Sequence, residues 1–194
     1  MQVIKKTNSG IQNLSLDAVL LDRRKVFLTG GIDSESVDLV VKQLLFLESM
    51  DEREPIQLII NSPGGEVLAG LYLYDQLKGM KVPIDIYCAE MAASMAAILL
   101  AAGRKGHRYI LKHSKVMIHE PLISSSSGGI SGSASSIAKS AESIMQTKRD
   151  LVAILSQDTG RSEKEIEKAV SYDNFMTAEE AVKFGICDKI VERI

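Results

Sequence analysis

Apolar residues recur along the chain with two different spacings, which predict strands and helices in turn. The short apolar runs KVFLTG (25–30) and IQLIIN (56–61) are typical of strands, the second buried on both faces, and each leads to a glycine-containing turn. Between 34 and 50, apolar residues recur three and four positions apart, which predicts a helix with Asp33 or Ser34 as its N-cap. The turn SPGG is expected to open a second helix that reaches about residue 80.

The second half of the chain continues this alternation. The run PIDIYCA predicts a strand that leads directly to an apolar helix beginning near Ser94. Two more strands, RYILK and KVMIHEP, precede a Ser/Gly-rich segment and a long amphipathic helix. The capping boxes SEKE and TAEE predict two short helices, the second ending at Gly185, and ICDKIV predicts a last strand. The whole pattern favours an α/β fold with crossover connections, in one domain over residues 1–194.

Composition narrows the possible functions. The 194 residues are 45% apolar and carry a net charge of −2, which argues against a nucleic-acid partner. Cys88 and Cys187 form no CxxC pair, so neither a zinc site nor a disulfide framework is expected, and no Walker motif suggests ATP hydrolysis. The N-terminus lacks a signal-peptide core, and the longest apolar run, 91–102, falls short of the about 20 residues that span a bilayer. We therefore expect a cytoplasmic protein without a membrane partner.

Ser94 is the first candidate for chemistry. It is the only uncharged polar side chain in EMAASMAAILLAAG and lies at an expected strand-to-helix junction. Free N–H groups and the helix dipole favour developing negative charge there, as a nucleophile requires. Serine is also common at helix starts, so the local sequence allows a structural role as well. A nucleophilic serine needs a base within hydrogen-bond reach and a third group that orients the base.

Three histidines are available as the base. His107 is flanked by cations in an expected exposed turn, and His113 lies in an expected turn between two strands. His119 ends the apolar run VMI, so we expect it where a buried strand emerges. A histidine bound only to backbone carbonyls would fit the same position, and local sequence does not separate the two roles.

Two further features also have both structural and functional interpretations. Asp173 is one of 25 acidic residues and lies between two short helices, where Tyr172 and Phe175 are expected to shield it from water, although most such residues are caps. Gly64 and Gly65 follow a strand and open a helix. Such a turn can present N–H groups to an oxyanion, and it is also an ordinary connection between a strand and a helix.

Four segments together resemble a known family. INSPGGEVLAGLYLYD, AASMAAILLAAGRKGHRY, SKVMIHEPL and YDNFMTAEEAVKFGICDKIV resemble, in this order, the proteolytic subunit of ATP-dependent Clp proteases, the ClpP family of serine peptidases. The resemblance runs from about residue 25 to 191. It implies a ClpP/crotonase-like α/β fold of repeated β-β-α units. An N-terminal segment at 1–24 and an extended handle strand and helix at about 122–160 would complete this fold.

The resemblance also implies roles for individual residues. Ser94 resembles the nucleophile, His119 the general base and Asp173 the residue that orients the imidazole. The backbone N–H groups of Gly65 and Met95 match the oxyanion hole, and neither a metal ion nor another cofactor is implied.

Members of this family work inside a closed assembly. Their subunits form seven-membered rings that stack face to face as a tetradecamer. An AAA+ unfoldase such as ClpX, ClpC or ClpA feeds unfolded polypeptides into the chamber, whereas short peptides enter unaided. The resemblance therefore implies a homo-oligomeric serine endopeptidase whose ATP is used by its partner.

Several positions depart from the family pattern. Gln57 and Ile59 replace tyrosines that often serve in unfoldase docking, and Asn174 replaces an arginine that helps to join the two rings. The handle strand is also expected to be longer, with four serines at 124–127. The remaining departures are Glu90 and Ala96 in place of glycines, and Glu120 in place of glutamine. They indicate a divergent paralogue, which could also mix into rings with another ClpP.

Two other functions compete with the peptidase. The first is a catalytically weak ring scaffold that supports an active paralogue, which the altered docking positions favour and the complete set Ser94, His119 and Asp173 opposes. The second is an acyl-CoA enzyme of the crotonase type, in which a nucleophilic serine would have no role.

Overall fold

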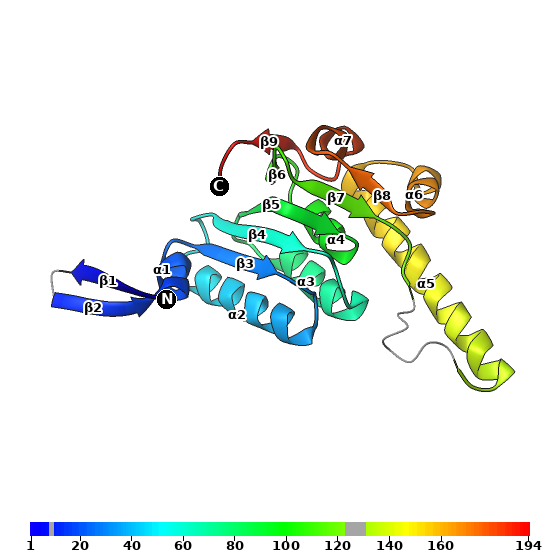
Figure 1. Ribbon diagram of the computed structural model, residues 1–194, viewed down its shortest axis with the longest axis horizontal. Helices are drawn as coiled ribbons and strands as arrows, with labels where there is room; N and C mark the ends of the chain where they lie inside the picture. The colour runs from blue at the N-terminus through cyan, green and yellow to red at the C-terminus, as the bar shows by residue number, and fades with distance from the viewer. Residues whose placement is uncertain (8–9, 123–130) are drawn as a thin grey trace.

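The computed structural model describes residues 1–7, 10–122 and 131–194. Within these residues, a mostly parallel seven-stranded sheet lies with helices against it (Figure 1). Its main path runs in the order β3 (Lys25–Thr29), β4 (Ile56–Ser62), β5 (Ile84–Ala93), β6 (Arg108–Leu111) and β9 (Lys189–Val191). β7 (Lys115–Ile118) pairs with the last residues of β5, and β8 (Asn174–Met176) pairs antiparallel with β7. The mixed α/β architecture expected from the sequence is confirmed.

One face of the sheet carries the core. Burial alternates along β3, where Val26 and Leu28 are buried and Phe27 is exposed, because successive side chains point to opposite faces. Two helices, α2 (Ser34–Met50) and α3 (Val67–Gly79), lie against the buried face (Figure 1). Ile59 on β4 belongs to the other face yet is only 4% exposed, because its strand neighbours are Phe27 and Tyr87. The expected burial of this strand on both faces is confirmed at that position.

The predicted helix starts are confirmed by their caps. Asp33 accepts a hydrogen bond from the N–H of Ser36 at the start of α2. Ser162 and Thr177 form the capping boxes of α6 (Glu163–Val170) and α7 (Ala178–Phe184). Gly185 ends α7 in the left-handed conformation, as expected.

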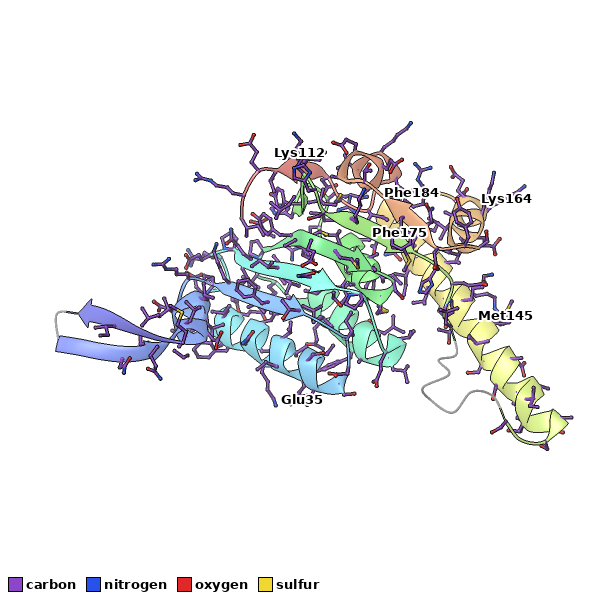
Figure 2. All side chains as sticks on the ribbon, in the orientation of Figure 1. Glu35, Lys112, Met145, Lys164, Phe175 and Phe184 are labelled. Atoms are coloured by element: carbon purple, nitrogen blue, oxygen red, sulfur yellow. The ribbon has the colours of Figure 1, made fainter. Side chains whose placement is uncertain are left out.

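The long predicted helix is α5 (Ala134–Thr159), and it projects from the body of the molecule (Figure 1). Its last turns bury Leu151, Val152 and Leu155, whereas its first turns are exposed. Met145 lies on the projecting part and is 49% exposed (Figure 2). Most of the expected handle strand, residues 123–130, lies outside the described residues. Among the described residues, no helix combines the length and apolarity needed to cross a membrane.

A hairpin, a helix and a short strand were not predicted from the sequence. The N-terminal segment forms a hairpin of β1 (Gln2–Thr7) and β2 (Gly10–Ser15), followed by α1 (Leu16–Asp22) (Figure 1). The third is the strand β8, which has only three residues. It lies directly after Asp173 and so bears on the candidate site.

Arg108 is the largest polar side chain in the core and is 1% exposed. Its guanidinium donates to both carboxylate oxygens of Asp188 and to the carbonyl oxygens of Ala101 and Asp158. The carboxylate of Asp188 also accepts the N–H of Gly106. This network joins β6 to the end of α5 and to the segment before β9.

Both cysteines are free and buried. Burial raises the pKa of the Cys88 thiol and of the Cys187 thiol to about 12. Each thiol therefore stays protonated at neutral pH and packs as an apolar side chain.

Candidate active site

Ser94 lies in a sharp turn between β5 and α4 (Met95–Ala101). Its backbone has φ 54° and ψ −124°, a conformation that costs a non-glycine residue about 1–3 kcal/mol. The N–H of Ser94 donates to Met117 O at 2.8 Å, and the N–H of Ala97 donates to Ser94 O at 3.0 Å. These bonds hold the strained turn, and the hydroxyl makes no helix-capping bond, so it remains available for other partners.

The strain at Ser94 predicts an unusual order of stabilities. Ser94→Gly is expected to have a free energy of unfolding about 1 kcal/mol higher than Ser94→Ala, because glycine accepts a positive φ and alanine does not. Urea denaturation of both variants measures this difference. An alanine variant as stable as the glycine variant would show that the turn stores no strain.

His119 directly follows β7 and bridges the serine and the aspartate. Its Nε2 atom lies 2.9 Å from Ser94 Oγ, and its Nδ1 atom lies 3.2 Å from Asp173 Oδ1. An ionised carboxylate only accepts hydrogen bonds, so Nδ1 carries the proton and Nε2 accepts from the Ser94 hydroxyl. This is the tautomer that a general base next to a nucleophilic serine requires.

Backbone pairing on both sides fixes His119 relative to Asp173. In the β7–β8 pair, Ile118 lies opposite Asn174, so the residue before His119 faces the residue after Asp173. On the other side, the N–H of Glu120 donates to Val170 O at 2.8 Å. The histidine and the aspartate are therefore brought together by strand register, although they are far apart in the sequence.

The expectation that aromatic neighbours shield Asp173 is wrong for this chain. The Asp173 side chain is 66% exposed, and Tyr172 and Phe175 are themselves 61% and 59% exposed. The cause is the alternation along β8, where Met176 is buried and Phe175 is exposed. Shielding of this carboxylate therefore requires something outside the described residues.

The other two histidines lie elsewhere. The Nδ1 atom of His107 is 2.7 Å from Asp85 Oδ1 at the opposite end of β5 from Ser94, and its side chain is half exposed. His113 lies in the turn between β6 and β7, as predicted. The structure thus brings only His119 to the serine.

The glycine turn packs directly against Ser94. A Cβ atom on Gly64 would lie 2.7 Å from both Ala93 O and Ser94 Cβ, and one on Gly65 would lie 2.1 Å from Ile32 O. Only glycine permits so close an approach at either position. Met95 is the first residue of α4, so its N–H has no acceptor within the helix, and the N–H of Gly65 donates to no backbone carbonyl among the described residues. Both donors are available to an oxyanion.

A surface groove lies beside these residues. It has a volume of about 310 Å³ and mixes apolar side chains with hydroxyls. Val67 and Pro121 place it two residues beyond Gly65 and two beyond His119, respectively. The lining residues are Val67, Pro121, Leu122, Ser140, Ser143, Ile144 and Thr147, the last four from α5. Within the described part of the chain, no three His, Cys, Asp or Glu side chains gather as a metal site.

This geometry can be compared with known families. A family model described as Clp protease matches residues 8–194 of the chain. The chain belongs to the Clp protease family. Family membership supports a peptidase role, and the mostly parallel sheet with the seven helices of the described residues agrees with the ClpP fold expected from the sequence.

Glu90 and Ala96, where the resemblance described above implies glycine, differ in what they require of the backbone. Glu90 has φ 67°, a backbone conformation that glycine adopts without strain and other residues do not. Its carboxylate accepts a hydrogen bond from Asn61 Nδ2 at 2.6 Å. It lies where the β4–β5 register shifts, between the pairs Ile60–Cys88 and Ser62–Ala92. Ala96 lies within α4 and is fully buried, so a methyl group there only fills space. The strain at Glu90 and at Ser94 could not be read from the sequence by residue type.

Proposed function

We propose that this Clp protease family member is a serine endopeptidase in which Ser94, His119 and Asp173 form the catalytic triad. The observation that carries the proposal is the chain of two hydrogen bonds from Ser94 Oγ through the imidazole to Asp173, next to a turn that offers free N–H groups. The Clp protease match over residues 8–194 supports the same reaction class.

The chemistry is acyl transfer to water. Ser94 Oγ attacks the peptide carbonyl carbon while His119 Nε2 takes the hydroxyl proton, and the N–H groups of Gly65 and Met95 bind the oxyanion. His119 then gives the proton to the leaving amine, and the acyl-enzyme forms. Water, deprotonated by the same imidazole, releases the acid and restores Ser94. Asp173 keeps the proton on Nδ1 throughout.

The assembly is part of the proposal. Subunits form seven-membered rings stacked as a tetradecamer, in the cytoplasm, and an AAA+ unfoldase such as ClpX, ClpC or ClpA delivers unfolded polypeptides. ATP is used by that partner, and this chain needs no cofactor. Two elements that stand out from the body support contacts between copies: the projecting helix α5 and the N-terminal hairpin (Figure 1).

A scaffold that assembles with an active paralogue is the second candidate. Two observations favour it. Ile59, at a position that often serves in unfoldase docking, is only 4% exposed and offers little apolar surface. Asp173 is 66% exposed and therefore weakly placed to orient His119 through a partly screened hydrogen bond.

One experiment separates these functions. Purified protein whose mass corresponds to assembled rings is given a short fluorogenic peptide, and in parallel a fluorophosphonate that labels activated serines. Turnover together with a label that mass spectrometry assigns to Ser94 is expected. Assembled rings that neither cleave the peptide nor take the label would favour the scaffold.

A further inference from the structure

We infer that the ion pair between Glu120 and Lys148 positions the α5 wall of the groove relative to His119, and so determines how tightly an apolar substrate side chain is held. This inference rests on the proposed function, because it assigns the groove to the substrate. The pair takes no part in the bond-making steps: both residues act through their neighbours.

The location of the pair is the main argument. Lys148 Nζ lies 2.5 Å from Glu120 Oε2. Glu120 is the residue between His119 and the groove-lining Pro121, and Lys148 directly follows the groove-lining Thr147. The ion pair therefore joins the two sides of the groove at positions next to their lining residues.

Glu120 is held firmly enough to act as an anchor. Its own N–H donates to Val170 O at the end of α6, on the element that leads to Asp173. The carboxylate thus extends from a backbone that is already tied to the site. Its ion pair with Lys148 therefore connects α5 to His119 and to the end of α6.

Lys148 lies at the boundary between the buried part of α5 and the exposed part that lines the groove. One turn further along, Leu151 and Val152 are buried, and on the other side Met145 is 49% exposed. The packed part of the helix therefore ends close to Lys148, while the groove-lining residues Ser140 to Thr147 lie beyond it. The Lys148 side chain is 25% exposed and that of Glu120 43%, so solvent screens their attraction only in part.

A second ion pair offers a matched control. Lys42 Nζ lies 2.5 Å from Asp38 Oδ2, but both residues belong to α2 and their side chains are 71% and 52% exposed. That pair connects no separate elements. Lys42→Met makes the same chemical change as Lys148→Met, away from the groove.

Two substrates distinguish a change in how the groove holds the substrate from a general loss of catalytic activity. One is a fluorogenic peptide with a leucine that can enter the groove, and the other is p-nitrophenyl acetate, which is too small to fill it. Lys148→Met is expected to raise KM for the peptide about fivefold, with kcat for the peptide and all parameters for the ester within about twofold of wild type. Lys42→Met is expected to change neither substrate.

Charge reversal provides the rescue. Glu120→Lys and Lys148→Glu are each expected to raise the peptide KM, whereas the double variant regains the wild-type KM within about twofold, because the pair is restored with opposite orientation. A double variant that is no better than the single ones would overturn the inference. So would an equal loss of turnover on the peptide and the ester.

Binding to an inactive chain makes the test independent of catalysis. In the Ser94→Ala background, fluorescence anisotropy gives the Kd of the labelled leucine peptide with and without Lys148→Met. An approximately fivefold weaker Kd supports the inference even if the wild type proves to be a scaffold. An unchanged Kd would contradict the inference about the ion pair, whereas a wild-type protein without turnover would contradict only the proposed function.

Discussion

Replacing Ser94 with alanine is expected to lower kcat for a short peptide by about 10⁴-fold or more. Ser94 Oγ lies 2.9 Å from His119 Nε2, and no other hydroxyl in residues 1–7, 10–122 and 131–194 is hydrogen-bonded to this imidazole, so none of them is placed to replace it as nucleophile. The oxyanion donors and the groove remain, so KM is expected to change little. His119→Ala should cause a similar loss, and the double variant should be no worse than either single variant, because the two residues act as a unit.

Peptide turnover by the purified variants measures this effect, with the mass of each assembly recorded on the same samples. Ser49→Ala is the matched control, since Ser49 is exposed on α2, away from the groove, and its hydroxyl donates to Phe46 O. Retention of more than about one hundredth of the activity in Ser94→Ala would remove Ser94 from the nucleophile role.

Replacing Arg108 with methionine is expected to lower the free energy of unfolding by about 3–5 kcal/mol. The change leaves Asp188 without its guanidinium partner and removes the donors to the carbonyl oxygens of Ala101 and Asp158. Since Arg108 is 1% exposed, water cannot easily take the place of these donors. Urea denaturation measures the change, and Arg149→Met is the matched control, because Arg149 is exposed and, among the described residues, its guanidinium donates to Gln146 on its own helix.

The same network predicts a pH dependence. Burial raises the pKa of Asp188, but hydrogen bonds from Arg108 and from backbone N–H groups outweigh it and hold this pKa below its usual value of 3.8. A carboxyl group with a lowered pKa stabilises the fold above its unfolded-state pKa, and this contribution is lost as the pH falls through the folded-state pKa. The wild type should therefore lose more stability than Arg108→Met between about pH 5 and 2. Parallel curves of unfolding free energy against pH for the two proteins would show that the Asp188–Arg108 pair does not contribute to the pH dependence in this range.

Local rules predicted the elements whose signals lie within a few residues. The capping residues Asp33, Ser162 and Thr177 each start the helix that their spacing predicts. The strands of the central sheet were equally clear, because their apolar runs are bounded by turns. The hairpin of β1 and β2 was missed because its residues are mostly polar and show no regular alternation of apolar positions.

The candidate site shows where local rules end. His119 was recognisable as the end of a buried strand, but Asp173 was one of 25 acidic residues and was singled out only by family resemblance. The register of β7 and β8 is what places Asp173 beside His119. β8 has only three residues, and so short a strand gives almost no sequence signal. Likewise, the positive φ of Ser94 is imposed by the pairing of β5 with β7, which is a tertiary contact. The backbone strain at Ser94 could therefore not be predicted from residue types.

The proposed triad also links activity to the order of folding. Ser94 is 25 residues from His119 in the sequence, and His119 is 54 residues from Asp173, so the site draws on three separate parts of the chain. Contacts between such distant positions form late, because each closes a long loop. A chain that is still emerging or only partly folded has a serine but no base beside it. Under the proposed mechanism, the nascent subunit therefore has no activated serine until β7 and β8 have paired.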